Sequence, residues 1–292
     1  MKHAFLVIAH SQFEILGKLM SLLDDYRCDF YIHIDKKSKS DPREYLESIV
    51  KESKVRFIDR ISVNWGGYSI VECTLNLLES ALPSVYDYYH LLSGVDLPIK
   101  TKDEILEYFD KHNDTQFVSF ERPIVQEKYV DRLRYHSFFQ DTGSSFLQGI
   151  DRCIRQFERI IKYDRLRKAN LQVQFGSNWF SITHDFADWT VKQKQLINQV
   201  FRNTRCSDEL FIQTMLINSP YLPQVEEHAF QNDCRANLRL IDWKRGRPYV
   251  FHKSDLEELL NSPCLFARKF DMETDPDICE ALYDSLRNST LT

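Results

Sequence analysis

The chain has 292 residues and a formal net charge of −5, and 43% of its residues are hydrophobic and 28% charged. These values are typical of a globular protein with a large buried core, and they exclude disordered and fibrous classes. Because no basic stripe accompanies the acidic balance, a general nucleic-acid binder is excluded as well. With no low-complexity linker or internal repeat, residues 1–292 are expected to form one domain.

The apolar run Phe5–Ala9 is too short for a signal peptide or a membrane span, and no other segment approaches about 18 apolar residues. Seven cysteines are scattered without a Cys-x-x-Cys pair, so no zinc site is indicated and reduced thiols are expected. The expected location is therefore the cytoplasm.

The first hundred residues alternate apolar runs typical of buried strands with helical stripes. Capping-box patterns precede the expected helices, because Ser or Thr is followed three residues later by Glu. The expected strands are 5–9, 30–34, 55–58 and 88–92, and the capping boxes are Ser11–Glu14, Ser69–Glu72 and Thr101–Glu104. This alternation predicts an α/β fold with a mainly parallel central sheet flanked by helices.

Ligands of such sheets bind beyond the carboxyl ends of the strands. His10, Asp35 and Asp96 each follow an expected strand and therefore belong to this ligand edge.

The second part of the chain is less regular. Residues 121–172 read as irregular structure with one helix near 150–167, and 176–183 as a turn and a strand. Further expected elements are a helix near 185–199, a helix opening at Cys206–Glu209, a strand at 238–243 and a capping box at Ser254–Glu257.

Six strings resemble, in order, the signatures of the core-2/I-branching N-acetylglucosaminyltransferases and peptide O-xylosyltransferases. They are Val63-Asn-Trp-Gly-Gly-Tyr-Ser69, Tyr89-His-Leu-Leu-Ser-Gly-Val-Asp-Leu-Pro-Ile-Lys-Thr101, Gly176-Ser-Asn-Trp-Phe180, Ser207-Asp-Glu209, Ile241-Asp-Trp243 and Leu265-Phe-Ala-Arg-Lys-Phe-Asp271. The resemblance implies a GT-A-like fold, with a nucleotide-sugar half at 1–110 and an acceptor and catalytic half at 111–292.

An inverting sugar transfer needs a base that removes the proton of the acceptor hydroxyl. The resemblance assigns this role to Glu209, in the string Cys206–Phe211. Without the resemblance, the preferred interpretation of Asp208 and Glu209 is that they are first-turn acids that complement a helix dipole.

The resemblance also implies catalysis without a metal, because the family lacks a working Asp-x-Asp motif. Asp275-Pro276-Asp277 has that spacing but follows the last signature, so it is interpreted as surface. Cations must then stabilise the leaving diphosphate. The resemblance places one at Lys269, while the position of a second family arginine falls on Gly246, between Arg245 and Arg247, with Arg247 slightly favoured.

The remaining candidates bind substrates. The resemblance places His10, Asp35, Trp65, Gly66 and Asp96 in the donor half. Trp179 and Trp243 are candidate platforms for the acceptor sugar, although core packing explains each equally well. Residues 121–140, with Arg132, Arg134 and Tyr135, are a further acceptor-side candidate.

The resulting hypothesis is an inverting transferase that moves GlcNAc from UDP-GlcNAc to a glycan or glycolipid hydroxyl in surface polysaccharide synthesis, with peripheral contact at the inner face of a membrane. UDP-xylose is the alternative donor. A catalytically inactive sugar-nucleotide or glycan-binding protein and a metal-dependent retaining transferase are the alternatives from other classes.

Overall fold

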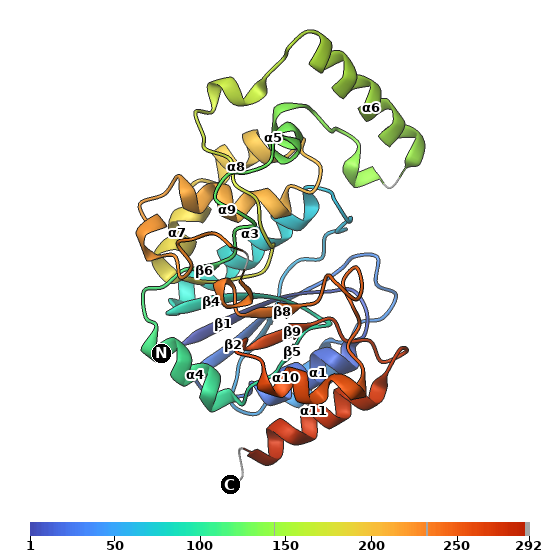
Figure 1. Ribbon diagram of the computed structural model, residues 1–292. Helices are drawn as coiled ribbons and strands as arrows, with labels where there is room; N and C mark the ends of the chain where they lie inside the picture. The colour runs from blue at the N-terminus through green and yellow to red at the C-terminus, as the bar shows by residue number, and fades with distance from the viewer. Residues whose placement is uncertain (143, 232, 290–292) are drawn as a thin grey trace.

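The computed structural model describes residues 1–142, 144–231 and 233–289, and its centre is a six-stranded sheet in the order β3-β2-β1-β4-β7-β6 (Figure 1). Its strands are β1 (His3–Ala9), β2 (Cys28–Ile34), β3 (Val55–Phe57), β4 (Tyr88–Ser93), β6 (Phe117–Val118) and β7 (Phe180–Thr183). The first four in this order pair in parallel, and β7 and β6 are antiparallel additions at one side. The predicted mainly parallel α/β sheet is confirmed.

A second, three-stranded sheet has the order β5-β9-β8. It consists of β5 (Leu97–Pro98), β9 (Phe266–Arg268) and β8 (Arg239–Ile241). Strands β8 and β9 are parallel, so the residues that follow both of them emerge at one edge of this small sheet. A strand near 238–243 was expected, whereas β9 was recognised only as a signature string.

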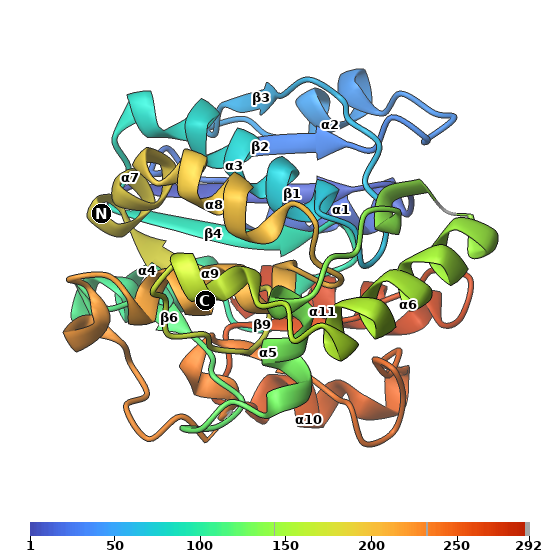
Figure 2. The ribbon, with the colours of Figure 1, turned by 90° about the horizontal axis from the view of Figure 1, so that it is seen from above.

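Helices cover both faces of the central sheet, as Figures 1 and 2 show. Alternate residues of β1 point to opposite faces, so Phe5 and Val7 belong to one core cluster and Ala4 and Leu6 to the other. The first cluster packs against α1 (Phe13–Leu22), α2 (Arg43–Ile49), α4 (Lys102–Lys111), α10 (Leu256–Asn261) and α11 (Pro276–Ser289). The second packs against α3 (Ser69–Ala81), α5 (Glu127–Arg134), α7 (His184–Lys192), α8 (Lys194–Phe201) and α9 (Asp208–Ile217).

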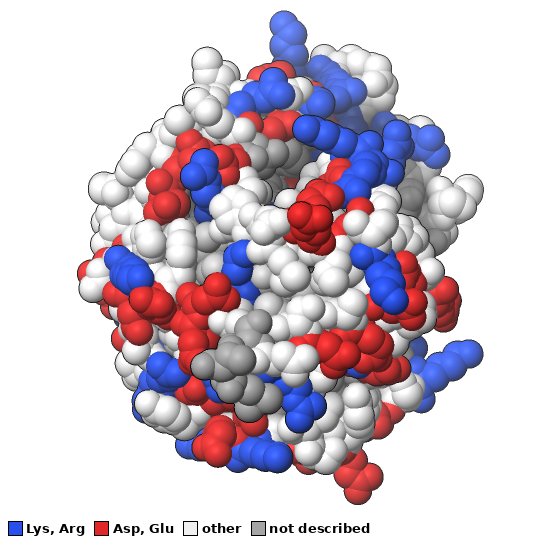
Figure 3. Space-filling model, turned by 60° about the horizontal axis from the view of Figure 1, so that its bottom comes forward, with Lys and Arg blue, Asp and Glu red and all other residues white. Residues whose placement is uncertain are grey.

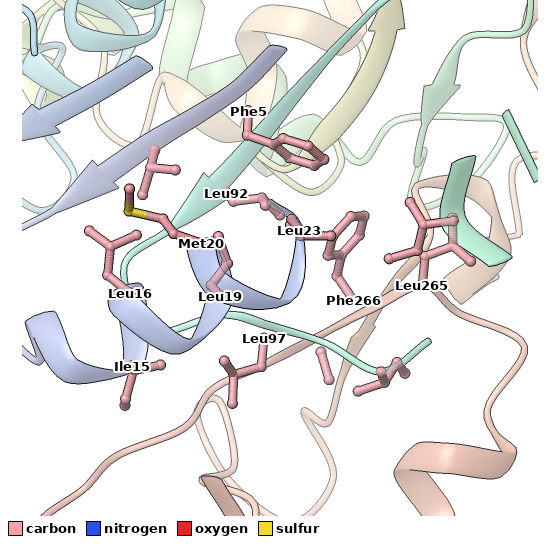
Figure 4. Close-up of a cluster of buried hydrophobic side chains, with 14 of the residues drawn as sticks. Phe5, Ile15, Leu16, Leu19, Met20, Leu23, Leu92, Leu97, Leu265 and Phe266 are labelled. Carbon is pink, nitrogen blue, oxygen red and sulfur yellow. The ribbon is translucent and has the colours of Figure 1, made fainter. Parts of the chain in front are cut away.

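The first cluster joins the two sheets. In Figure 4, Ile15, Leu16 and Leu19 of α1 lie below Phe5 of β1, and Phe266 of β9 comes in from the second sheet. Residues from distant parts of the chain therefore share one core, which fixes the C-terminal strands relative to the ligand edge of the central sheet.

One helix stands apart from these layers. Helix α6 (Ser145–Ile160) projects from the top of the molecule in Figure 1, and in Figure 2 it lies on the side toward which β1, β2 and β4 point. The predicted helix near 150–167 is thus present but begins earlier, and α5 in the same region was not expected. The expected helix at 185–199 is two helices, α7 and α8.

The predicted helices form, but most of the capping boxes predicted at their starts do not. Thr101 and Glu104 form the predicted box at the start of α4. At α1 and α3, in contrast, the residue at the helix N-cap makes no side-chain capping bond, and near α10 the box is formed by His252 and Asp255 instead. The predictions at Ser11, Ser69 and Ser254 are therefore wrong.

The helices of the described residues are all too short or too polar to cross a membrane.

Candidate active site

The ligand edge gathers the first two donor-side candidates. Ala9 is in register with Ile34, so His10 and Asp35 follow neighbouring strands at the same edge, where His10 is exposed. The Asp35 side chain is buried and accepts hydrogen bonds from the backbone N–H groups of Lys37 (2.8 Å) and Val63 (3.3 Å). Asp35 therefore fixes the start of the segment that carries the Trp-Gly-Gly turn.

That turn is held from a distant part of the chain by Asp141. The Asp141 carboxylate accepts from the Ser69 hydroxyl (2.5 Å) and from the Tyr68 N–H (3.0 Å), so it supplies the cap that α3 lacks locally. A Cβ on Gly67 would overlap this carboxylate. Trp65 beside it is 83% exposed, so its ring is available to a ligand rather than packed in the core.

The same turn contacts the segment that opens α9. The Cys206 N–H donates to the Gly66 carbonyl at 2.8 Å, and Gly66 adopts φ +75°, a conformation that favours glycine. The Trp-Gly-Gly and Ser-Asp-Glu strings, which are about 140 residues apart, are therefore adjacent in space.

Glu209 lies in the first turn of α9 with its side chain partly exposed. Arg132 of α5 donates to Glu209 Oε2 at 2.6 Å, and its guanidinium also lies over the rings of Tyr129 and Phe175. This charged hydrogen bond orients the carboxylate, while the exposed side leaves room for an acceptor hydroxyl. Arg132 comes from the segment that was only a tentative acceptor-side candidate.

Asp208 has a different environment. Its Oδ1 is buried and has no hydrogen-bond partner among the described residues. Burial first, and then repulsion from Glu209, raises the pKa of Asp208 to about 7. Of two consecutive carboxyl groups, one is thus paired and partly exposed, and the other is buried and inclined to hold a proton.

The segment Gly176–Trp179 connects Glu209 to the next part of the site. Gly176 donates its N–H to the Glu209 carbonyl (2.9 Å), and Gln213 of α9 donates to the Ser177 carbonyl (2.6 Å). The ring of Trp179 then lies 4.1 Å from the Arg268 guanidinium. Trp179 is therefore a stacking partner for a cation, and this contact occupies part of the surface expected to bind an acceptor sugar.

Asp96 faces Arg268 from the other side. The Asp96 carboxylate is 1% exposed, accepts from the Ser93 N–H at 2.9 Å, and has its Oδ1 3.6 Å from Arg268 Nε. Burial raises the pKa of Asp96, and the positive charge of Arg268 opposes that rise. The buried pair closes the base of the Ser93–Pro98 loop.

A second buried arginine was not identified from the sequence. Arg239 of β8 donates to the Ser181 hydroxyl (2.7 Å) and to the carbonyls of Phe180 (2.6 Å) and Leu91 (3.2 Å). Burial lowers its pKa to about 9. Arg239 ties β8 to the central sheet, so the small sheet and the large one cannot move independently.

Lys269 and Trp243 emerge at the same edge of the small sheet, because Ile241 is in register with Arg268. The loop that follows Trp243 returns to Lys269, whose N–H donates to the Tyr249 carbonyl at 3.3 Å. Trp243 is 63% exposed, and Arg247 in this loop is exposed too. These three side chains can all reach a ligand.

Arg245, in the same loop, is engaged. It pairs with Asp242, with Asp255 at 2.8 Å and with Glu258 at 2.8 Å. With its charge compensated by three carboxylates, Arg245 is a poor candidate for a diphosphate, and the geometry favours Arg247 as the second cation.

Groups of three or more His, Cys, Asp or Glu side chains that could hold a metal are absent from the described residues. Asp275, in the Asp-x-Asp spacing, accepts from the N–H groups of Ile278 (3.1 Å) and Lys253 (3.0 Å) and so caps α11. That catalysis proceeds without a metal stays a prediction.

A hollow of about 730 Å³ opens beside α5, with Val130, Arg134, Leu166, Val173 and Asn218 in its wall. The acceptor-side candidate segment 121–140, including Arg134, forms part of this wall, whereas Glu209, Lys269 and the donor-side candidates do not line the hollow. The contacts instead join the motifs into one series along the ligand edge, from Asp35 through the Trp-Gly-Gly turn, Glu209 and Trp179 to Arg268 and Asp96.

A family model for the Core-2/I-Branching enzyme matches residues 3–261, which is most of the chain. The chain belongs to this family. Its members are glycosyltransferases, and the arrangement of the predicted motifs along one edge is consistent with the membership.

Curated relatives carry xylosyltransferase names. Xylosyltransferase 2 of Rattus norvegicus is 25% identical over 96% of this chain, and human Xylosyltransferase 1 is 24% identical over 94%. The chain spans about a third of the length of these relatives, 33% and 29% respectively. Among solved structures, mouse xyloside xylosyltransferase 1 in its apo form aligns over 91% of this chain and 96% of its own, with 12% identity and a TM-score of 0.39.

The sequence analysis did not identify the contributions of Arg268 and Asp141 to the site. Arg268 was passed over in favour of Lys269, although it stands in the same signature string, and Asp141 lies in no signature at all. Only the three-dimensional contacts show that Arg268 pairs with Asp96 and that Asp141 caps α3.

Proposed function

We propose that the protein transfers a sugar from a UDP-sugar to a glycan or glycolipid hydroxyl with inversion at the anomeric carbon, and that Glu209 is the general base. The observation that carries the proposal is the position of the Glu209 carboxylate. It is partly exposed and oriented by Arg132, and its segment contacts the Trp-Gly-Gly turn through the Cys206 N–H and the Gly66 carbonyl.

In the proposed reaction the acceptor hydroxyl gives its proton to Glu209 as its oxygen bonds to the anomeric carbon. The bond between that carbon and the UDP oxygen breaks, and the electron pair leaves with UDP. Lys269 and Arg247 stabilise the charge that develops on the diphosphate, in the role that a divalent metal fills in other transferases. Asp35, His10, Trp65 and Gly66 line the donor side, and Trp243 offers an exposed ring to the acceptor.

The donor that we propose is UDP-GlcNAc, with UDP-xylose as the second candidate. The names of the curated relatives favour xylose. The two sugars differ by an N-acetyl group and by the C6 hydroxymethyl group, so a site shaped for one discriminates through lost contacts or overlap with the other. We further propose an acceptor held at a membrane, as in surface polysaccharide synthesis.

Release of UDP tests this function. The purified protein is incubated with UDP-GlcNAc, UDP-xylose, UDP-glucose, UDP-galactose and UDP-GalNAc, each with excess EDTA and with Mn²⁺. We expect slow release of UDP from one donor at the same rate in both conditions. Failure to bind or hydrolyse any donor in either condition would favour the inactive binding protein, and activity with Mn²⁺ alone would favour a metal-dependent enzyme.

A further inference from the structure

Helix α6 turns its acidic residues toward the protein. Asp151 accepts from the backbone N–H groups of Phe138 (2.9 Å) and Phe139 (3.0 Å). Two helical turns further along, the Glu158 carboxylate accepts hydrogen bonds from the backbone N–H of His136 at 2.8 Å and from the His136 ring at 2.5 Å. Both carboxylates are buried, so polar bonds rather than apolar packing attach this face of the helix to the molecule.

The outward face of α6 is apolar. Phe146, Ile150, Cys153, Phe157 and Ile160 follow one another at intervals of four, three, four and three residues, which places them on one side of a helix. Phe146 is 76% exposed, Phe157 61% and Ile160 71%. Here α6 differs from an ordinary surface helix, whose apolar side faces the core, and the pattern marks an interaction surface.

Within residues 145–163 the exposed charged residues are all basic, whereas Asp164, which follows, is exposed. Every Asp and Glu of residues 145–163 is buried, whereas Arg152, Arg159 and Lys162 are exposed. Arg159 pairs with Asp131 at 3.1 Å, and no such partner is described for Arg152 or Lys162. Although the chain is acidic overall, Lys and Arg side chains gather in places on its surface, as at the upper right of Figure 3.

We propose that the stripe of α6, from Phe146 to Ile160, rests in the surface layer of a membrane that carries anionic headgroups. Apolar side chains flanked by Arg and Lys, with no exposed acid among residues 145–163, match the apolar boundary and negative charge of such a surface. A second copy of this chain fits less well, since a symmetric contact would bring the same cations together. With Arg152 and Arg159 within its 16 residues, α6 lies on the membrane and does not cross it.

The position of α6 connects this surface to the candidate active site. The short helix η2 (Gln140–Thr142) precedes α6 closely, and it carries Asp141, which holds the Trp-Gly-Gly turn. Asn64 of that turn also donates to the Asp141 carbonyl at 2.8 Å. A membrane under α6 would thus lie beside the ligand edge. The purpose of this docking, to meet a membrane-held acceptor, rests on the proposed function, whereas the docking itself does not.

Vesicle co-sedimentation without donor or acceptor tests the proposal. The full chain is mixed with phosphatidylcholine vesicles, with or without about a third phosphatidylglycerol. We expect binding to the anionic vesicles that weakens as salt rises. The double variant Phe146→Ser/Phe157→Ser should reduce the partition coefficient at least about tenfold, since each Phe loses most of its transfer free energy.

Two further variants make the test decisive. The control variant Tyr26→Ser/Val85→Ser removes two similarly exposed apolar side chains. They precede β2 and β4, at the edge of the sheet opposite to the ligand edge, so this variant should bind like the unchanged protein. Arg152→Glu/Lys162→Glu leaves the stripe intact and should abolish the preference for anionic vesicles. Circular dichroism checks that each variant is folded.

Equal binding of the Phe146→Ser/Phe157→Ser variant, or no binding of the unchanged protein, would overturn the proposal. A dimer in gel filtration that this variant dissolves, without vesicle binding, would identify the stripe as a contact between copies and would overturn it as well. Because vesicle binding is read without donor, its failure leaves UDP release unaffected, and the two proposals can fail separately.

Discussion

Consecutive carboxyl groups at the start of α9, those of Asp208 and Glu209, have opposite surroundings. Glu209 is oriented by Arg132 and reaches the surface, while Asp208 has a buried oxygen without a described partner. Sequence spacing alone offered the helix-dipole role for both. The structure separates them because burial penalises the charged form of Asp208, whereas Glu209 is partly exposed and pairs with Arg132.

Asp208 predicts how stability depends on pH. Its pKa is raised to about 7, above the value near 4 of an unfolded chain, so the folded state holds its proton more tightly. Its contribution to stability is complete below pH 4 and is lost as the pH rises through 7. The variant Asp208→Asn should therefore be more stable than the unchanged protein at pH 8, on the order of 1–3 kcal/mol, and similar at pH 4. Urea unfolding at both values measures this; a variant less stable at pH 8 would contradict it.

Arg268 predicts the cost of an uncompensated buried charge. Its guanidinium lies 3.6 Å from the Asp96 carboxylate, on which the charge of Arg239 also acts, and stacks on Trp179. We expect Arg268→Ala to lower the free energy of unfolding by about 3–5 kcal/mol, as for other broken buried pairs. The double variant Asp96→Asn/Arg268→Met, which removes both charges, should recover part of this loss in chemical denaturation. A single variant within about 0.5 kcal/mol of the unchanged protein would refute the pair.

At the scale of elements, α3 shows that a helix can be capped from far away. Asp141 occupies the space that a side chain at position 67 would need. We expect Gly67→Ala to destabilise the protein by about 1–3 kcal/mol through this overlap. Gly149→Ala in α6 is the matched control, because its added Cβ would have its nearest neighbour 3.9 Å away and should be neutral or stabilising by up to about 1 kcal/mol. Thermal unfolding of the two variants measures the difference. Equal melting temperatures for Gly67→Ala and Gly149→Ala would contradict the prediction.

The elements also show what a sequence can and cannot predict. The continuous apolar run Phe5–Ala9 predicts a buried strand, and the motifs place Glu209 at the start of a helix. Both predictions succeed because both signals are local. The sequence pattern predicts that the Ser69 hydroxyl caps the helix, but this hydroxyl donates to the carboxylate of Asp141, 72 positions away. The partner of Glu209, Arg132, is 77 positions away and in a helix without a clear pattern. Such contacts depend on tertiary packing, which competes with local propensity and leaves no short-range signal.

At the scale of the whole molecule, the two halves of the chain meet at the ligand edge. The Trp-Gly-Gly turn contacts the α9 segment through Gly66 and Cys206, and the small C-terminal sheet is fixed by Arg239 and by the shared core. The strand that precedes Lys269 is therefore held to the central sheet. If Lys269 and Arg247 replace a metal, UDP release should be equal in EDTA and in Mn²⁺, whereas Lys269→Ala should slow it by about tenfold to a thousandfold, in the range seen when one charge-stabilising group is removed.

Sugar transfer with Glu209 as base is the central claim, and the most direct measurement compares UDP release, with and without acceptor, by the unchanged protein and by Glu209→Gln. The variant keeps the size and part of the hydrogen bonding of the side chain but cannot take a proton. The account predicts a fall of about 10²–10⁴-fold with intact donor binding, while Glu47→Gln, on the exposed side of α2, keeps full activity. A Glu209→Gln variant that retains the activity of the unchanged protein would contradict the account.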